Sequence, residues 1–215
     1  MSNKRTLIWA VALTLVTLFI SLMISSRLPE QMVSHWNAQG QPNGTMPRTA
    51  AVFLIPGMMV VINLILFAIP EIDPLKHNIE TFRPSYNALI LVLNVYMLYI
   101  HLITLLWNVG LRVDMNLLLA PAMAGIFYAA ARLMQKARRN YFIGIRTPWT
   151  LSSDFVWEKT HQRAALVFKG MAVLTLLCML LPGWFLLVLM VPIFASVIYL
   201  VVYSYVLFRR EKCAS

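Results

Sequence analysis

Four polar residues recur at every seventh position inside one long apolar stretch of this chain. They are Asn87, Asn94, His101 and Asn108. Seven residues make almost two turns of an α-helix, so the four side chains share one face and drift by only about 20° per step. The residues between them are mostly aliphatic, and the stretch is long enough to cross a bilayer of about 30 Å. We therefore expect a transmembrane helix with a polar seam, the name used below for these four residues.

Amide and imidazole groups are costly in hydrocarbon unless they find hydrogen-bond partners. We expect the seam to face protein or a water-filled cavity, with the other helices arranged around it. The composition agrees with a membrane protein, because 60% of the 215 residues are hydrophobic and 12% are charged, against about a quarter charged in soluble domains. The two cysteines, Cys178 and Cys213, lie too far apart to indicate a disulfide framework or a metal cluster.

Six apolar stretches are long enough to be membrane spans. They are predicted at residues 7–24, 50–69, 87–109, 116–134, 165–181 and 184–208. The first is too long for the apolar core of a cleaved signal peptide, so it is expected to be retained. A tight turn is predicted at Leu181-Pro182-Gly183. In the fourth span, Ala122, Gly125 and Ala129 form a small-residue face that would let a neighbouring helix approach closely. The predicted fold is all-α, a polytopic integral membrane protein with a single six-helix domain over residues 1–215.

The basic residues are distributed unevenly between the two sides of this predicted bundle. Fifteen of the 18 Lys and Arg residues fall on one side, and the other side has Arg27, Arg48 and Arg112. The positive-inside rule then places both termini and the loop 135–164 in the cytoplasm, and the loop 25–48 outside, in an inner or plasma membrane. Topology and anionic headgroups account for the net charge of +10, so we expect the lipid bilayer as a partner and no direct nucleic-acid contact.

The outward loop 25–48 is rich in Pro, Gly and Asn. This composition indicates a specific conformation without regular secondary structure, which is typical of a functional surface loop. The candidate binding residues in this loop are Leu28, Pro29, His35, Trp36, Asn37, Gly40 and Gly44.

The cytoplasmic loop contains a second motif. Pro148 disfavours helix at Thr147, whereas Ser152 or Ser153 followed by Asp154 is a typical helix start. The helix that follows is expected to lie along the membrane interface before it continues into the fifth span. The candidate residues of this motif are Asn140, Gly144, Arg146, Thr147, Pro148, Trp149, Trp157 and His161.

Both motifs resemble the SdpI family of bacterial membrane proteins. Leu28-Pro29, His35-Trp36-Asn37 and Gly40-Gln41-Pro42-Asn43-Gly44 are similar to the amino-terminal signature of that family. Asn140, the stretch Gly144 to Thr150, Trp157 and His161 are similar to its second signature. The resemblance implies a six-span protein of the immunity and signalling type. The best-known member of the family protects a cell against a secreted toxic peptide and also captures a small DNA-binding repressor at the membrane.

Three function classes remain open at this point. The first is an immunity protein that binds a secreted antimicrobial peptide outside and a repressor inside. The second is a small transporter with the seam along its pathway, although the sequence has no paired half-chain repeats. The third is a metal-dependent membrane peptidase with His35 and His101 as metal ligands, although a His-Glu-x-x-His motif is missing. The sequence has no Gly-x-Ser-x-Gly motif, phosphate loop or nicotinamide fingerprint, so no catalytic residue and no cofactor are expected.

Overall fold

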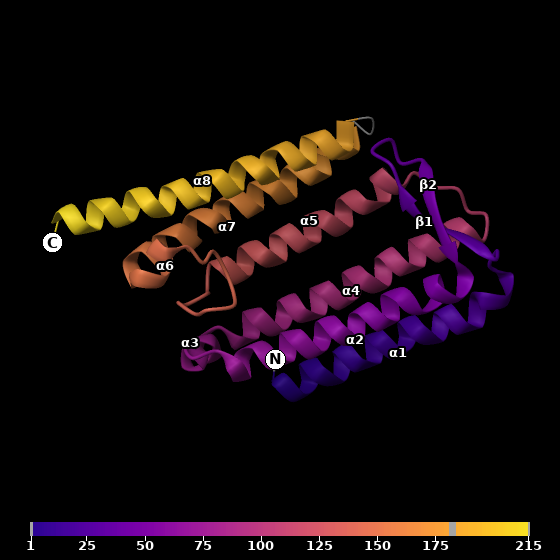
Figure 1. The fold of residues 1–215 in the computed structure, drawn as a ribbon, viewed down its shortest axis with the longest axis horizontal. Helices are drawn as coiled ribbons and strands as arrows, with labels where there is room; N and C mark the ends of the chain where they lie inside the picture. The colour runs from indigo at the N-terminus through magenta and orange to yellow at the C-terminus, as the bar shows by residue number, and fades with distance from the viewer. Residues whose placement is uncertain (1, 181–183, 215) are drawn as a thin grey trace.

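A computed structural model describes residues 2–180 and 184–214 (Figure 1). Its helices are α1 (Asn3–Ile24), α2 (Arg48–Ile72), α3 (Lys76–Thr81), α4 (Arg83–Asn108), α5 (Met115–Met134), α6 (Pro148–Ser152), α7 (Asp154–Leu177) and α8 (Phe185–Ala214). Two short 3-10 helices, η1 (Ser25–Arg27) and η2 (Cys178–Leu180), and two strands, β1 (Gln31–Trp36) and β2 (Pro42–Pro47), complete the described elements. The turn predicted at Leu181-Pro182-Gly183 lies outside the described residues.

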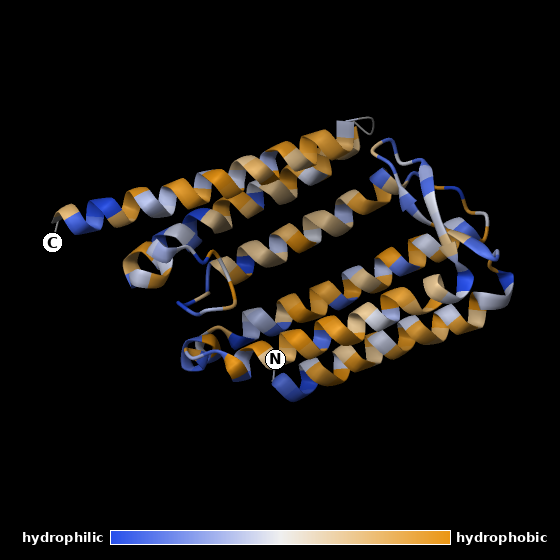
Figure 2. Ribbon diagram, viewed as in Figure 1, coloured by the Kyte–Doolittle hydropathy of each residue, from blue (hydrophilic) through white to orange (hydrophobic). Residues whose placement is uncertain are grey.

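Six of these helices are long and apolar enough to cross a membrane, namely α1, α2, α4, α5, α7 and α8. Figure 2 shows them as mainly hydrophobic along their length, with hydrophilic residues gathered toward their ends. The all-α, polytopic fold class is therefore confirmed. Both ends of the chain lie at the same end of the bundle as α3 and α6, and the β-hairpin lies at the opposite end (Figure 1).

The six long helices form two groups joined by the contact between α4 and α5. The first group is α1, α2 and α4, and in the second α7 packs against both α5 and α8. The residues that α1 buries are all small, namely Thr6, Ala10, Thr17 and Ser21. Small side chains let helix backbones approach closely within a membrane, which accounts for the extensive packing of α1 against α4.

At Gly125, the predicted small-residue face of the fourth span does not make a close helix contact. Gly125 is exposed, and no heavy atom lies within 4 Å of the place where its Cβ would be. Instead, α5 packs most extensively against α7. The small residues buried on these two helices are Ala120, Ala124 and Ala131 of α5 and Ala164, Ala165 and Ala172 of α7. The span has several alanine positions at helical spacing, and the spacing alone did not indicate which face would be used.

The segment 25–48 differs from the prediction, because it contains regular secondary structure. Strands β1 and β2 form an antiparallel hairpin with pairs such as Val33–Thr45 and His35–Gly44, and the register is irregular between Val33 and Trp36. Met32 is fully buried and belongs to an apolar cluster with Leu105 of α4. Pro42, Asn43, Gly44 and Pro47 therefore belong to β2 itself, whereas Asn37 and Gly40 lie in the tip that joins the strands.

The helix predicted ahead of the fifth span runs directly into that span. Helix α7 is continuous from Asp154 to Leu177, and the side chain of Ser153 accepts the Val156 N–H as its amino-terminal cap. The predicted helix start at the Ser152-Ser153-Asp154 motif is thus confirmed. Trp157 and His161 are each only 1% exposed, so they belong to the protein interior. Burial of these two large rings explains why this part of α7 packs within the bundle.

Candidate functional site

The polar seam of α4 faces the protein interior. Asn87, Asn94 and His101 are at most 2% exposed, and Asn108 is partly exposed at the hairpin end. The predicted interior orientation is confirmed for the first three residues. Each of the four side chains has a hydrogen-bond partner on an element other than α4, so the seam is a line of contacts between α4 and its neighbours.

The centre of the seam is a reciprocal pair of amides. Asn94 Nδ2 donates to Asn63 Oδ1 at 2.8 Å, and Asn63 Nδ2 donates to Asn94 Oδ1 at 2.9 Å. Asn94 Nδ2 also donates to the carbonyl of Ile90. Asn63 belongs to α2, so this pair joins α2 to α4 within the membrane-spanning region. The sequence contained a signal for this partner, since Asn63 is an isolated amide in an otherwise apolar span.

Two further seam residues bond to α1. Asn87 Nδ2 donates to Asn3 Oδ1 at 3.0 Å, and His101 Nε2 is hydrogen-bonded to Ser21 Oγ. Because the Ser21 hydroxyl donates its proton to the Thr17 carbonyl, His101 Nε2 must be the donor in this bond. His101 therefore acts as a structural hydrogen-bond donor to α1 in this arrangement.

The last seam residue connects the bundle to the hairpin. Asn108 Oδ1 accepts the Val33 N–H at 2.8 Å, and Asn108 Nδ2 donates to the Val33 carbonyl at 2.9 Å. The side chain thus bonds both backbone groups of Val33, as a neighbouring strand would. A second amide, Asn116 of α5, donates to the Ala38 carbonyl at 3.0 Å. The hairpin is therefore attached to both α4 and α5.

The hairpin candidates divide into exposed and structural residues. His35 is exposed, and its Nδ1 donates to Asn43 Oδ1 at 2.6 Å on the other strand. A Cβ on Gly44 would lie 3.1 Å from His35 Cβ, so a larger residue at position 44 would crowd the imidazole. Gly40 has a φ of +74°, which favours glycine at the hairpin tip.

The remaining hairpin candidates support the shape of the hairpin. Asn37 Oδ1 accepts the backbone N–H groups of Gln39 and Gln41, at 3.0 and 2.9 Å, and so forms the tip. Leu28 is buried and Pro29 is exposed at the hairpin base.

An aromatic contact extends the hairpin surface onto α4. The ring of Trp36 packs edge-on against Trp107, with ring centroids 5.6 Å apart. The Arg112 guanidinium lies 3.6 Å from the Trp107 ring centroid, a geometry typical of cation–π contacts. Sequence reasoning singled out Trp36 but missed Trp107 and Arg112. The contact between Trp36 and Trp107 depends on the fold, since these two residues are far apart in the chain, whereas Arg112 follows Trp107 closely.

The second motif is built around Asn140. Its side chain is fully buried, accepts the N–H groups of Phe142 and Ile143, and donates to the carbonyls of Arg138 and Ile143. One amide thus satisfies four backbone groups and fixes the turn that leads into Gly144. This turn, with α6 and the first two turns of α7, is called the inner platform below, and it comprises residues 140–161.

His161 holds the other side of this turn. Its Nε2 accepts the Ile145 N–H at 3.0 Å, and its Nδ1 lies 2.8 Å from the Trp157 carbonyl. The proton is therefore on Nδ1, because Nε2 is an acceptor. The Trp157 ring stacks on the His161 ring at 4.0 Å, and Trp157 Nε1 donates to the Ala137 carbonyl at 2.9 Å. These residues fix the turn to α7 and to the end of α5.

The middle of the motif joins α6 to α8. Thr147 and Thr150 form a reciprocal capping box at the start of α6, and the hydroxyl of Thr147 bonds to that of Ser204 at 3.1 Å. The Trp149 ring lies 5.0 Å from the ring of Tyr205. Pro148, the first residue of α6, is exposed. The motif thus holds the carboxy-terminal helix in place.

Arg146 is the exposed charged residue of the motif. Its Nη1 donates to the Tyr141 carbonyl at 2.6 Å. Sequence reasoning missed Asp73, which is 2% exposed and accepts the Tyr141 N–H at 2.9 Å. Asn78 likewise donates to the Arg139 carbonyl. These bonds join the loop after α2 to the inner platform. Nearby, the hydrogen bond from Arg83 lowers the pKa of the Glu80 carboxyl below its ordinary value.

The residues proposed as metal ligands have other partners. His35 bonds Asn43 and His101 bonds Ser21. Among residues 2–180 and 184–214, no group of three or more His, Cys, Asp or Glu side chains is arranged to hold a metal ion. The arrangement of the candidates is that of two structured surfaces at opposite ends of a bundle, joined by the seam.

Comparison with known proteins agrees with this arrangement. The SdpI/YfhL protein family profile matches residues 136–204, and a domain of unknown function, DUF1648, matches residues 12–60. The chain is 27% identical over 158 residues to immunity protein SdpI of Bacillus subtilis (strain 168). The aligned region covers 74% of this chain and 73% of that relative. The chain is thus similar to the SdpI family over residues 136–204 and to one of its members over most of its length. No solved structure gives a significant match.

Each of the two matched regions contains one of the two structured segments. The DUF1648 region contains the hairpin, and the SdpI/YfhL region contains α6, α7 and most of α8. In this chain the seam on α4 lies between the two matched regions. Neither profile therefore includes Asn87, Asn94, His101 or Asn108.

Proposed function

We propose that this chain is a membrane immunity protein that protects its cell against a secreted antimicrobial peptide. The observation that carries the proposal is the similarity to immunity protein SdpI, which extends over 73% of that relative. Orientation follows from the charge distribution, with fifteen of the 18 basic residues at the end that holds both termini. By the positive-inside rule, that end is cytoplasmic and the hairpin faces outward.

The hairpin is the proposed contact surface for the peptide. Asn108 and Asn116 attach it to two helices, so it presents a rigid surface and a bound peptide need not order it. The exposed imidazole of His35 and the exposed guanidinium of Arg112, which lies over the buried ring of Trp107, supply hydrogen-bonding and cationic groups on the outer side.

The inner platform is the proposed surface for a small repressor. Its Tyr141 N–H bonds the buried Asp73 between α2 and α3, and its Thr147 hydroxyl bonds the buried Ser204 of α8. Arg146 projects from it as an exposed cation. Because Arg146 bonds a backbone carbonyl through one nitrogen, its remaining donors are free to engage a carboxylate on a partner or a lipid phosphate. Lysine could replace arginine in the second role, but not in a two-pronged bond to a carboxylate.

A complementation experiment tests the proposed function. The chain is expressed in a Bacillus subtilis strain that lacks its own immunity protein SdpI, and survival is measured beside toxin-producing cells. We expect restored survival with the parent chain. We expect weaker protection from His35→Ala, and full protection from Arg210→Ala, an exposed residue of α8 outside both proposed surfaces. Expression of the chain in the membrane without any gain in survival would reject protection against that toxin.

The inner surface is tested separately. Membrane recruitment of a labelled repressor is compared for the parent chain, Arg146→Lys and Arg146→Ala. Loss of recruitment in both variants would support specific recognition of a carboxylate. Full recovery with lysine would rule out such recognition by Arg146 and leave the inner platform as a membrane anchor.

A further inference from the structure

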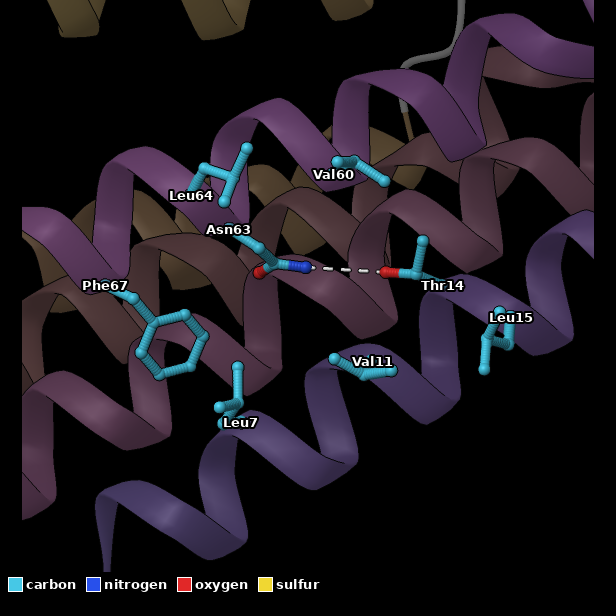
Figure 3. Close-up of a pocket in the computed structure, with 8 residues that line it drawn as sticks. All are labelled: Leu7, Val11, Thr14, Leu15, Val60, Asn63, Leu64 and Phe67. Carbon is cyan, nitrogen blue, oxygen red and sulfur yellow. Dashed lines mark hydrogen bonds between the residues drawn. The ribbon is translucent and has the colours of Figure 1, made fainter.

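A laterally open groove lies between α1 and α2, on the side of the bundle away from α5. It is lined by Leu7, Val11, Thr14 and Leu15 of α1 and by Val60, Asn63, Leu64 and Phe67 of α2, with a volume of about 280 Å³ (Figure 3). Several of its walls are half exposed, including Leu15 at 60% and Leu64 at 67%. In a bilayer these walls face hydrocarbon, so the groove is accessible from within the membrane.

The groove is lined almost entirely by apolar atoms, and Asn63 and Thr14 supply the few polar atoms at its floor. Figure 3 shows Asn63 pointing from α2 toward Thr14 of α1, and the hydrogen bond from Asn63 Nδ2 to Thr14 Oγ1 measures 3.4 Å. This is long for an N–H···O bond, whose usual length is about 2.9–3.0 Å. The other hydrogen of Asn63 Nδ2 and one lone pair of its Oδ1 are used in the pair with Asn94.

The floor therefore retains hydrogen-bonding capacity. An amide oxygen accepts two hydrogen bonds, and Asn63 Oδ1 receives one from Asn94. Its second lone pair can accept a hydroxyl or amide proton, and the weak bond to Thr14 can be exchanged for a better one. Asn63 and Thr14 lie near the middle of their helices, Arg48–Ile72 and Asn3–Ile24. Lipid acyl chains have no hydrogen-bonding group at that depth, whereas a membrane-inserted peptide can have one.

We propose that this groove binds a membrane-inserted apolar peptide helix with a hydroxyl or amide side chain near its middle. The apolar flanks of such a helix would fill the walls, and its polar side chain would bond Asn63. This inference rests on the proposed function and specifies its substrate as a peptide already inserted in the bilayer. It adds a second contact site, within the membrane, to the outward hairpin.

The test uses full-length protein in phosphatidylcholine vesicles, with a fluorophore on the exposed Cys213. The probes are two synthetic leucine-rich helices flanked by lysines, one with a central serine and one with a central leucine. Energy transfer reports binding. We expect the serine helix to bind about threefold more tightly, which is the ratio that a typical hydrogen bond inside a membrane provides.

Two variants and one control locate the binding. Asn63→Leu should remove the preference for serine, and Leu64→Trp should weaken both probes by filling the groove. The control, Val197→Trp, alters a residue of α8 that is 57% exposed and should change neither affinity. Equal binding of both probes to the parent, or unchanged binding by Leu64→Trp, overturns the proposal.

Other occupants have their own signatures. If two labelled copies of the protein show energy transfer and the Leu64→Trp substitution abolishes it, a second copy is the occupant. A co-purified phospholipid that neither probe displaces would identify an acyl chain. Either result overturns the proposal.

The survival assay separates this inference from the proposed function. If Leu64→Trp still protects cells, immunity stands and the groove is not its site. If the parent gives no protection but binds the serine helix as expected, the groove stands and the immunity function fails.

Discussion

A Cβ atom on Gly144 would overlap Nε2 of His161. The imidazole fills this space because Nε2 accepts the N–H of Ile145, the residue next to Gly144. The backbone of Gly144 also has a φ of +110°, which residues with a Cβ rarely adopt. The second motif thus needs glycine at this position for two independent reasons.

We expect Gly144→Ala to destabilise the protein by at least about 1–3 kcal/mol, the usual cost of a strained backbone conformation at a non-glycine residue. Thermal unfolding in detergent measures this effect. Gly170→Ala is the matched control, because Gly170 lies in α7 and a Cβ there would meet no atom within 4 Å. Equal melting temperatures for the two variants would show that the turn can move away from His161.

The reciprocal amide pair predicts non-additive effects. Asn63→Leu and Asn94→Leu should each cost about 0.6–1.7 kcal/mol, the range measured for hydrogen bonds inside membranes, because each leaves the other amide without its partner. The double variant should cost less than the sum of the two, since it removes both unpaired groups. A double-mutant cycle of detergent stability measures the coupling. Strict additivity would contradict a direct bond between the amides.

The attachment of the hairpin by Asn108 predicts a local change in dynamics. Asn108→Leu removes both bonds to Val33, so the amides of β1 should exchange hydrogen at least about tenfold faster, as expected when about 1.4 kcal/mol of local stability is lost. Hydrogen exchange followed by mass spectrometry tests this. The inner platform should be unchanged in the same experiment, and faster exchange throughout the chain would indicate a global effect instead.

The orientation is tested by cysteine labelling on intact cells. A membrane-impermeant maleimide should label Asn43→Cys on the hairpin and should not reach the native Cys213, which is exposed at the other end. The buried Cys178 should remain unlabelled until the protein is denatured. Labelling of Cys213 in intact cells would reverse the orientation derived from the charges.

The membrane spans could be predicted because a bilayer imposes a simple requirement on the sequence. A helix such as Arg83–Asn108 must be long and apolar, and its polar residues must find partners. The seven-residue spacing therefore predicted which face of α4 is interior. The identity of the partners depends on the rotation and depth of other helices, which spacing within α4 does not report. Asn63 could have been found by matching isolated amides between spans.

The hairpin and the inner platform were harder to predict for a different reason. Turn residues such as Asn37 and Gly40 were recognised, but the strands on either side of them are short and their register is irregular. In the second motif, the helix start at Ser153 was local and predictable, whereas the burial of Trp157 depends on a carbonyl of Ala137, 20 residues earlier. Local patterns indicated which segments are structured, and distant contacts determined where they lie.

Helix α8 packs chiefly against α7 and α6, and this determines how freely its sequence can change. Leu200 and Ser204 are at most 4% exposed, while Val197, Ile198 and Val202 are more than half exposed. Lipid accepts any apolar side chain of suitable length, so the outer positions can drift among aliphatic and aromatic residues with little cost. Related chains should therefore preserve a narrow stripe through the buried Phe185, Leu189, Leu200 and Ser204 and diverge over the exposed face of the last helix.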